Sequence, residues 1–279
     1  MGIRLIAMDL DGTALQPDRR SFSPRLIAAL GEAHKRGIVI APVTGRQFNM
    51  LPPAVQNHPV WENLVVLCNG GQIRNLATGE LLYEKNISGE ALKQLLVISE
   101  QLDIPIEFSV NDVLYLTEKS LVQQQGHSHL DFHLNTILAN HGKVVSSLKP
   151  FCEMAVEKCN LPYIPAEKHR DAESLLKPVP VSAVWSSGSS MEITHPDAKK
   201  GIALEALCEI LNIPIENTMA LGDSGNDESM LRAAGLGVAM GNAPDFVRAI
   251  ADEVTENSEN DGAAIAIERY VLACGSETV

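Results

Sequence analysis

The chain has 279 residues, 45% of them hydrophobic, and a formal net charge of −13 at pH 7. This length suits two domains, each with a sizeable core. The acidic balance argues against nonspecific binding to nucleic acid or to an anionic membrane, which requires a basic surface. It leaves an anionic small substrate open, because a metal ion and a few cations can invert the local field.

The five cysteines contain no Cys-x-x-Cys pair and are typical of buried thiols in a reduced compartment. The N-terminus passes directly into an apolar strand, without the basic region, apolar block and cleavage site of a signal peptide. No apolar run approaches the ~20 residues that span a bilayer. We therefore expect a cytoplasmic protein that does not act at a membrane.

The first part of the chain alternates predicted strands with a helix. Ser23-Pro24 is typical of a helix start, with serine as the N-cap and proline in the first turn, and Gly37 is typical of the helix end. Three short apolar strands are predicted, at 3–9, 38–43 and 63–68. Because each strand ends in a polar or glycine-rich turn, the pattern indicates βαβ units and a parallel sheet.

The pattern changes in the middle of the chain, where hairpins as well as helices join the strands. Helices are predicted at 89–102 and about 118–140, and strands at 104–110, 113–117, 143–148, 180–186 and 190–194. Asn111-Asp112 lies between two of these strands as a hairpin turn. The stretch from about 150 to 178 has no clean period. We predict an inserted α+β domain at 86–188.

The α/β alternation returns from Met191 onward. Helices are predicted at 200–211, 228–234 and 244–251, and strands at 218–222 and 236–240. Residues 1–85 and 189–279 would then form one core that the inserted domain interrupts. The predicted fold class is α/β, with a Rossmann-like parallel sheet.

Two acids follow the first strand directly, in the sequence Asp9-Leu10-Asp11-Gly12-Thr13. Residues i and i+2 of a strand point to one side, and the carboxyl ends of strands in open α/β sheets border the ligand crevice. Two carboxylates 4 Å apart repel by roughly 4 kcal/mol at an effective dielectric near 20. They are tolerated when a cation lies between them or one holds a proton. Phosphoryl chemistry uses either arrangement.

A second acidic motif, Gly222-Asp223-Ser224-Gly225-Asn226-Asp227, also follows a predicted strand and precedes a helix. Its acids can therefore lie at the same edge of the sheet as Asp9 and Asp11. Three or more carboxylates facing one crevice suit Mg²⁺, which prefers oxygen ligands. The structural alternative is a Gly-Asp turn that caps the following helix.

Two further motifs offer groups that bind phosphate. Thr44 ends the second strand, so its hydroxyl and the backbone N–H groups that follow can hold phosphate oxygens. A simple Thr-Gly turn is the structural alternative. Lys199 and Lys200 precede a helix, and one of them can neutralise the charge of phosphate and carboxylates. A solvated surface lysine is the alternative there.

Together these motifs resemble those of the haloacid dehalogenase (HAD) superfamily. The four ordered motifs are Asp9-Leu10-Asp11-Gly12-Thr13, Thr44-Gly45-Arg46, Lys200-Gly201 and the run from Gly222 to Asp227. Val238-Ala239-Met240-Gly241-Asn242-Ala243 and Asp261-Gly262 further resemble the Cof-like branch of sugar-phosphate phosphatases. The resemblance covers both core segments, whereas the inserted domain matches a cap in position and length.

The resemblance implies specific catalytic roles. Asp9 would be the nucleophile that attacks phosphorus and forms an aspartyl-phosphate. Asp11 would be the acid that protonates the leaving alcohol and then the base for the hydrolytic water. Thr44 with Gly45, and Lys200 rather than Lys199 because the family's lysine precedes glycine, would hold the transferring phosphoryl group.

The resemblance also implies a Mg²⁺ cofactor. Asp9, Asp223 and the backbone carbonyl of Asp11 would bind the ion. Asp227 would support the waters of the metal from outside its ligand shell. Asn226 would bind phosphate or position the lysine.

A histidine cluster in the inserted domain is interpreted differently. His127, His129 and His133 lie close in sequence, and two of them are one helical turn apart. Because no cysteine or third matched ligand lies nearby, we interpret the cluster as a polar helix surface rather than a metal site.

Three functions fit these residues. The first is a Mg²⁺-dependent phosphomonoesterase acting on a small phosphorylated metabolite, with a sugar phosphate expected. The second is phosphoryl transfer to another hydroxyl, as in a phosphomutase. The third is a noncatalytic phosphometabolite-binding protein, against which the intact pair Asp9 and Asp11 argues. Sugar phosphates, pyridoxal phosphate, flavin mononucleotide and nucleotides all remain open as substrates, and the oligomeric state is open as well.

Overall fold

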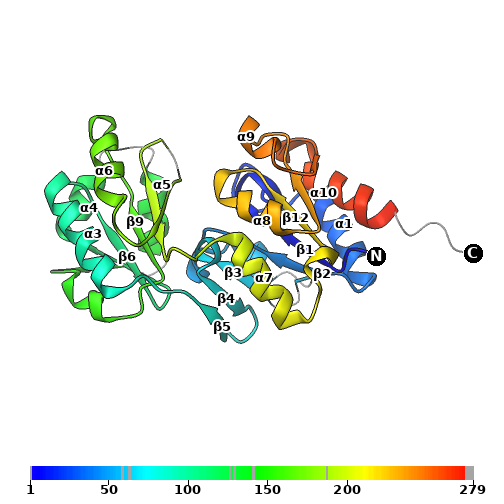
Figure 1. The fold of residues 1–279 in the computed structure, drawn as a ribbon, viewed down its shortest axis with the longest axis horizontal. Coiled ribbons are helices and arrows are strands. Elements are labelled where there is room, and N and C mark those ends of the chain that lie inside the picture. Colours follow the sequence, from blue (N-terminus) through cyan, green and yellow to red (C-terminus); the bar gives the residue numbers. More distant parts are fainter. Residues whose placement is uncertain are drawn as a thin grey trace, which may run out of the picture. The chain divides into compact units, whose positions relative to one another are not determined.

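The computed structural model describes residues 2–57, 60–61, 64–125, 127, 130–139, 142–186 and 188–273. The chain divides into two compact units (Figure 1). The first unit consists of Met1–Arg46, Leu51–Tyr83 and Lys199–Val279, and the second of Gln47–Met50 and Glu84–Ala198. The short segment Gln47–Met50 thus groups with the second unit, which nothing in the sequence pattern indicated.

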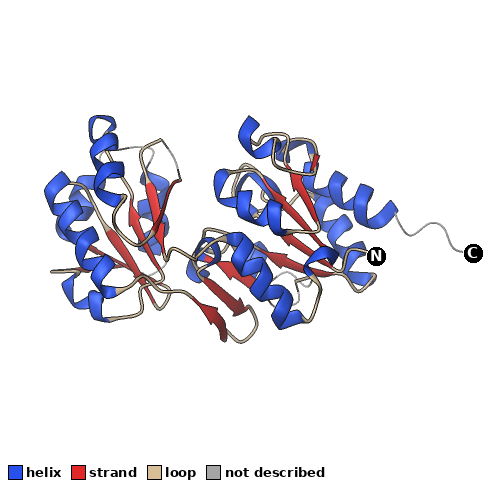
Figure 2. Ribbon diagram, in the orientation of Figure 1, coloured by secondary structure: helices blue, strands red, loops and turns tan. Residues whose placement is uncertain are grey.

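The first unit is built on a five-stranded parallel sheet in the order β14-β13-β12-β1-β2 (Figure 2). Its strands are β1 (Leu5–Met8), β2 (Val39–Pro42), β12 (Thr218–Gly222), β13 (Leu236–Ala239) and β14 (Glu253–Val254). Met8 pairs with Pro42 on one side and with Leu221 on the other. These three strands therefore end level, and the residues after them leave the sheet at one edge.

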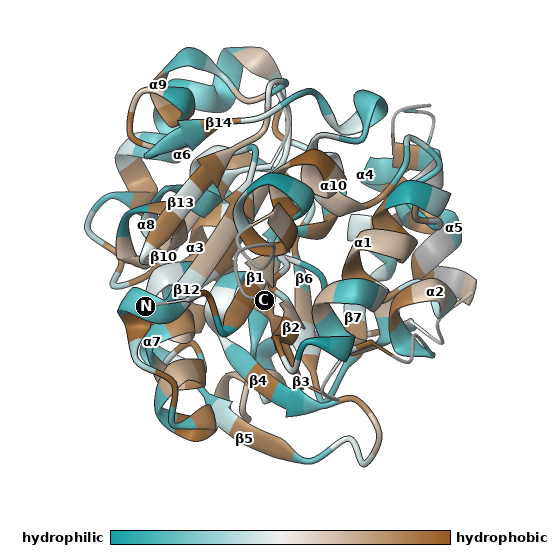
Figure 3. Ribbon diagram, turned by 90° about the vertical axis from the view of Figure 1, so that its right-hand side faces the viewer, coloured by the Kyte–Doolittle hydropathy of each residue, from teal (hydrophilic) through white to brown (hydrophobic). Residues whose placement is uncertain are grey.

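Helices cover this sheet and share its apolar core with the strands. They are α1 (Pro24–Lys35), α2 (Pro53–Gln56), α7 (Lys200–Leu211), α8 (Glu228–Ala233), α9 (Asp245–Arg248) and α10 (Gly262–Ile267). Buried Leu204 and Leu207 of α7 belong to the same apolar cluster as Leu5 and Ala7 of β1. The hydropathy colouring of Figure 3 shows the apolar stretches along these elements. Among the described residues, no helix is both long and apolar enough to cross a membrane.

The third predicted strand has a different partner from the one expected. β3 (Leu64–Leu67) pairs antiparallel with β4 (Gln72–Asn75), and β5 (Leu81–Glu84) completes a three-stranded sheet. A single parallel bridge between Val43 and Val66 links β3 to the end of β2. The βαβ expectation failed beyond β3 because the turn after it is short, whereas a parallel partner needs a crossover of a dozen or more residues.

The second unit is an α+β structure with a six-stranded sheet in the order β10-β11-β9-β6-β7-β8. Its strands are β6 (Glu107–Val110), β7 (Val113–Thr117), β8 (Lys143–Val145), β9 (Lys158–Leu161), β10 (Ser182–Trp185) and β11 (Met191–Thr194). Its helices are α3 (Gly89–Leu102), α4 (Glu118–Gln124), α5 (Asp131–Ala139) and α6 (His169–Leu176). The predicted hairpin turn at Asn111-Asp112 is present, with both residues in the left-handed region.

Two details of the second unit differ from the sequence expectation. β11 pairs with β9 and β10, so the α/β alternation returns at α7 rather than at Met191. A strand carries the same period-two pattern in either sheet, which is why the sequence could not assign it. The helix expected over 118–140 is two helices, because Gln125 leaves α4 with extended backbone. β9 lies in the stretch for which the sequence showed no period.

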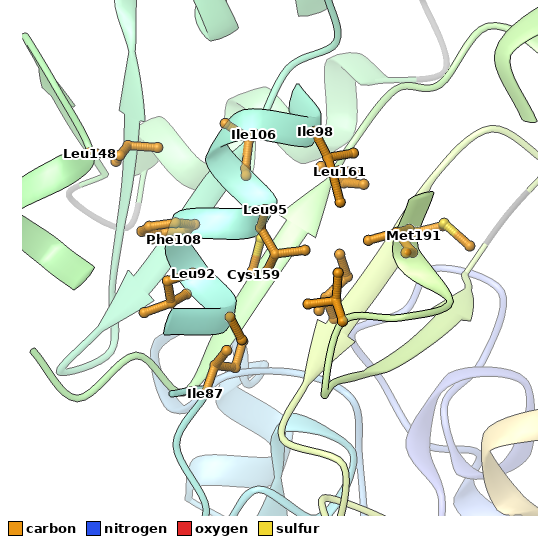
Figure 4. Packing of buried hydrophobic residues seen from close by; sticks show 14 of the residues in the cluster. Ile87, Leu92, Leu95, Ile98, Ile106, Phe108, Leu148, Cys159, Leu161 and Met191 are labelled. Atoms are coloured by element: carbon orange, nitrogen blue, oxygen red, sulfur yellow. The ribbon is translucent and has the colours of Figure 1, made fainter. Parts of the chain in front are cut away.

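Helix α3 packs on one face of this sheet and closes the core of the second unit. Phe108 of β6 and Cys159 of β9 lie in one apolar cluster with Leu92 and Leu95 of α3 (Figure 4). Ser88 caps the helix by accepting a hydrogen bond from the backbone N–H of Ala91 at 3.3 Å. The apolar side chains repeat with helical spacing, which fixes the face that α3 buries.

Phe108 is the largest fully buried side chain among the described residues, so its truncation tests this core. We expect Phe108→Ala to lower the unfolding free energy of the second unit by roughly 3–5 kcal/mol, through lost burial and the cavity left behind. Denaturant unfolding measures the change. Val97→Ala on α3, where Val97 is 61% exposed, is the control and should change stability by less than about 0.5 kcal/mol. Equal effects of the two changes would contradict this packing.

Candidate active site

Three carboxylates meet at the edge of the sheet in the first unit. Asp9 follows β1, Asp223 follows the neighbouring strand β12, and Asp227 lies four residues further on. One ligand oxygen of each lies within 4.8 Å of the others. The parallel pairing of β1 with β12 brings these residues together although more than two hundred residues separate Asp9 from Asp223.

Lys200, the first residue of α7, lies against this cluster with no solvent exposure. Its Nζ donates to Asp9 Oδ1 at 2.5 Å and to Asp227 Oδ1 at 2.6 Å. Lys199, the neighbouring lysine, is exposed at the N-cap of the helix. The structure therefore brings Lys200, and not Lys199, to the acids.

Asp227 organises the loop that carries the second acidic motif. Its Oδ2 accepts hydrogen bonds from the backbone N–H groups of Asp223, at 3.0 Å, and Ser224, at 2.9 Å. Together with the contact from Lys200, both carboxylate oxygens are engaged by the protein. Asp227 is thus a residue that fixes the loop.

The electrostatics of the cluster are set by burial. Burial, followed by the neighbouring carboxylates, raises the pKa of Asp9 well above its ordinary value despite the contact with Lys200. Burial and the charge of Asp227 raise the pKa of Asp223 to about 6. Burial alone would lower the pKa of Lys200, but the charges of Asp227 and Asp9 outweigh it and raise the pKa. The ammonium is therefore firmly charged.

The donor set fits a divalent cation. Three carboxylates face the one ammonium that contacts them in the described part of the chain, which leaves two negative charges without compensation. Burial, and after it the charge of Asp227, raises the pKa of Asp223. Carboxylate oxygens are the ligands that Mg²⁺ prefers. A doubly charged ion at this cluster would balance its charge.

Asp11 lies apart from the three clustered carboxylates and has its own cation. Arg46 Nε donates to Asp11 Oδ2 at 2.7 Å, and Nη2 donates to Oδ1 at 2.6 Å, in a bidentate pair. From the sequence, a cation between Asp9 and Asp11 or a proton on one of them was expected to relieve their repulsion. Instead each acid pairs with a different cation, because the backbone turns at Asp11 and Gly12. Arg46 was a missed partner, although it stands in the motif after Thr44-Gly45.

Thr44 lies at the same edge of the sheet, at the end of β2. It is buried, its backbone N–H donates to Val66 O at 2.9 Å, and its Oγ1 accepts from the N–H of Arg46 at 3.2 Å. Gly45, half-buried, lies between them. The turn after β2 is thus folded around the threonine hydroxyl, with Gly45 at its centre.

Three residues close to the site were not assigned from the sequence. Thr13 Oγ1 donates to Asp223 Oδ1 at 2.9 Å. Asn242 Nδ2 donates to the carbonyl of Gly12 at 2.9 Å and reaches Asp223 Oδ2 at 3.4 Å. Gly12 has φ +85, and a Cβ there would lie 2.4 Å from Asp223 Oδ2. Glycine is therefore required where the two acidic loops touch.

The histidines of the second unit are not simply a polar surface. His133 Nε2 lies 2.9 Å from Oε2 of Glu107, a fully buried acid that also accepts from Gln124 and Asn160. His127 stacks on Tyr163 with ring centroids 4.0 Å apart. His129 lies outside the described residues. His133 is thus half-buried, and it departs from the expected polar helix surface because its ring contacts a buried acid of β6.

Comparisons with known proteins agree with this architecture. A family model for haloacid dehalogenase-like hydrolases matches residues 6–267. The chain is 30% identical over 298 residues to phosphatase YwpJ of Bacillus subtilis (strain 168), covering 94% of this chain and 98% of that protein. It is 28% identical over 291 residues to pyridoxal phosphate phosphatase YbhA of Escherichia coli (strain K12), covering 98% and 100%.

A solved haloacid dehalogenase-like hydrolase from B. subtilis has the same fold, with a TM-score of 0.82 at 27% identity, covering 96% of this chain and 100% of that one. The chain belongs to the haloacid dehalogenase-like hydrolases. The predicted superfamily, the α/β fold and the class of HAD-type phosphatase are confirmed.

The ion pair in the second unit predicts a pH-dependent stability. The charge of Glu107 outweighs burial and raises the pKa of His133 above its ordinary 6.5, with Lys158 opposing and Glu192 adding to this effect. The stabilisation is therefore complete below pH 6.5 and is lost as the pH rises through the raised pKa. Burial alone would raise the pKa of Glu107, but the charge and hydrogen bond of His133 outweigh it and lower the pKa below 4.5. The contribution of Glu107 to stability is therefore lost only at acidic pH.

We expect the unfolding free energy of the second unit to fall between neutral and alkaline pH, as followed by denaturant titrations at several pH values. His133→Gln should remove this fall. The control, His195→Gln, changes a histidine outside the ion pair and should keep it. An identical pH profile for wild type and His133→Gln would contradict the ion pair.

Proposed function

We propose that this protein is a Mg²⁺-dependent phosphomonoester hydrolase that acts on a small phosphorylated metabolite through an aspartyl-phosphate intermediate. One observation carries the proposal: a buried Lys200 ammonium lies between Asp9 and Asp227, with Asp223 beside them. A lone nucleophilic carboxylate does not require two more acids within 4.8 Å, whereas a nucleophile that shares its site with a divalent ion and a phosphoryl group does.

The residues that would hold Mg²⁺ are Asp9, Asp223 and the backbone carbonyl of Asp11, with Asp227 supporting them from behind. When bound, the ion would neutralise charge on the transferring phosphoryl group. Thr13 and Asn242 would keep Asp223 oriented toward the ion, because each donates to a different oxygen of that carboxylate.

The first half-reaction would transfer the phosphoryl group to the protein. An Asp9 carboxylate oxygen attacks phosphorus, a new O–P bond forms, and the bond from phosphorus to the leaving alcohol breaks. Asp11 gives its proton to the departing oxygen. Lys200, Thr44 with Gly45, and Asn226 hold the phosphoryl oxygens, so that negative charge developing on them meets donors already in place.

The second half-reaction would restore the nucleophile. Asp11, now a carboxylate, takes a proton from water as that water attacks phosphorus. The bond between Asp9 and phosphorus breaks, and inorganic phosphate leaves. For Asp11 to act in both steps, its carboxyl must leave the bidentate grip of Arg46 during the cycle, since both of its oxygens are engaged in that pair.

The second unit would act as a cap that selects the leaving group and limits access of bulk water. The cap would comprise Gln47–Met50 and Glu84–Ala198, and it would therefore extend past the 86–188 expected from the sequence, because β11 belongs to its sheet. A sugar phosphate is the expected substrate. The relatives named phosphatase and pyridoxal phosphate phosphatase support a small phosphorylated metabolite in general.

The nucleophile is tested by Asp9→Asn. We expect this variant to lose essentially all phosphate release from a panel of phosphorylated metabolites while retaining its circular dichroism spectrum, because an amide does not attack phosphorus. EDTA should abolish wild-type release and Mg²⁺ should restore it. Asp171→Asn, which changes an exposed acid on α6, is the control and should keep full activity. Full activity in Asp9→Asn would rule out the assigned nucleophile.

The acid role of Asp11 is tested by changing the leaving group. We expect Asp11→Asn to lose about 10²–10⁴-fold in kcat/KM with an alkyl phosphate, whose leaving oxygen needs a proton. The leaving group of p-nitrophenyl phosphate departs unprotonated. With this substrate, the rate of the first step, measured as a single-turnover burst, should fall much less. Equal losses with both substrates would show that Asp11 serves binding or folding instead.

A further inference from the structure

The loop after β3 has a backbone that unrestrained chains rarely adopt. Cys68, Asn69 and Gly70 follow one another with φ values of 52, 58 and 101. Glycine occupies this region freely and asparagine tolerates it, but a cysteine there is strained. Successive residues of this kind persist only where surrounding contacts determine the conformation, and such places gather at functional sites.

The contacts that hold this loop come from the residues proposed to bind phosphate, in the turn after β2 and at the start of α7. The backbone N–H of Cys68 donates to the carbonyl of Arg46 at 3.0 Å, and that of Asn69 donates to the carbonyl of Thr44 at 3.1 Å. A Cβ added at Gly70 would lie 2.4 Å from the carbonyl oxygen of Lys199. The loop therefore touches both the turn after β2 and the start of α7.

The side chain of Asn69 reaches a third motif. It is buried, and its Oδ1 accepts a hydrogen bond from Asn226 Nδ2 at 2.9 Å. On the other side, Asn226 Oδ1 accepts from Ser224 Oγ at 2.5 Å. An amide turned the other way would bring its oxygen against the oxygen of Asn69. The two partners thus select one orientation of the Asn226 amide.

We propose that Asn69 is a positioning residue for phosphate recognition. It fixes the amide of Asn226 so that the second N–H of Nδ2, in a half-buried side chain, can donate to an oxygen of a phosphate monoester or of inorganic phosphate. The inference rests on the part of the proposed function that assigns Asn226 to the phosphoryl site. Asn69 acts through Asn226 and not on the substrate itself.

The test is a double-mutant cycle on phosphate affinity. Asn69→Gly keeps the left-handed backbone, which glycine favours, and removes the acceptor. We expect it to weaken binding of inorganic phosphate, measured by calorimetry with Mg²⁺ present, by roughly tenfold. In an Asn226→Ala background, the same change should cost less than about twofold, because the group that Asn69 positions is already gone.

A matched control separates this effect from the loss of an asparagine as such. Asn212 ends α7 with φ 52, and Asn212→Gly should leave phosphate affinity unchanged. Additive losses in the cycle, or unchanged affinity in Asn69→Gly, would overturn the positioning role. Binding is measured without turnover, so a wild type that binds phosphate but hydrolyses no ester would reject the proposed function and leave this inference standing.

A second measurement does not depend on an Asn69 variant that folds. The two side-chain amide protons of Asn226, assigned in wild-type NMR spectra by their absence in Asn226→Ala, occupy different surroundings. Adding inorganic phosphate should shift one of them strongly and leave the proton that faces Asn69 near its starting position. Equal shifts of both protons, or no shift of either, would overturn the fixed orientation.

Discussion

The site depends on one buried cation. Lys200 has no solvent exposure and donates to both Asp9 and Asp227, so an ammonium and two carboxylates have lost their hydration together. Such a group is tolerated only when its partners satisfy it, because an unpaired buried charge costs several kcal/mol. Asp223 adds a third acid, and the proposed Mg²⁺ would balance the negative charge of this cluster.

The parallel sheet is what allows this concentration of charge. β1 and β12 end level with each other, so Asp9 and Asp223 leave adjacent strands at the same edge. The cation comes from α7, which packs its apolar face on the sheet and thereby carries Lys200 to the acids. The two halves of the site are 191 residues apart at the Lys200–Asp9 contact. Insertion of the second unit does not disturb this pairing, because each half supplies whole elements to the sheet.

The sequence predicted the residues of this cluster but not the contacts that orient them. Aspartates directly after apolar strands can be recognised from the local sequence. The carboxyl ends of neighbouring parallel strands lie at one edge of the sheet, so these aspartates are expected to meet there. Two contacts join loops that are distant in the sequence: Arg46 with Asp11, and Asn69 with Asn226. No periodic pattern in the sequence indicates such contacts. The Asn-Gly-Gly run after β3 was visible, yet it indicates only a turn, and its role depends on what the turn touches. For the same reason, the partner of β11 could not be read from its alternation.

The two acids of the first motif lie in different surroundings. Asp9 is buried against the Lys200 ammonium, which α7 carries to the site, so the carboxylate of Asp9 is held in one position. Asp11 is more exposed, and its partner Arg46 follows another strand, so this pair is less buried than the pair of Asp9 with Lys200. A nucleophile needs a fixed position, whereas a group that both gives and takes a proton must be able to change partners. Under the proposed function, the separate cations Lys200 and Arg46 would let Asp9 stay fixed while Asp11 changes partners.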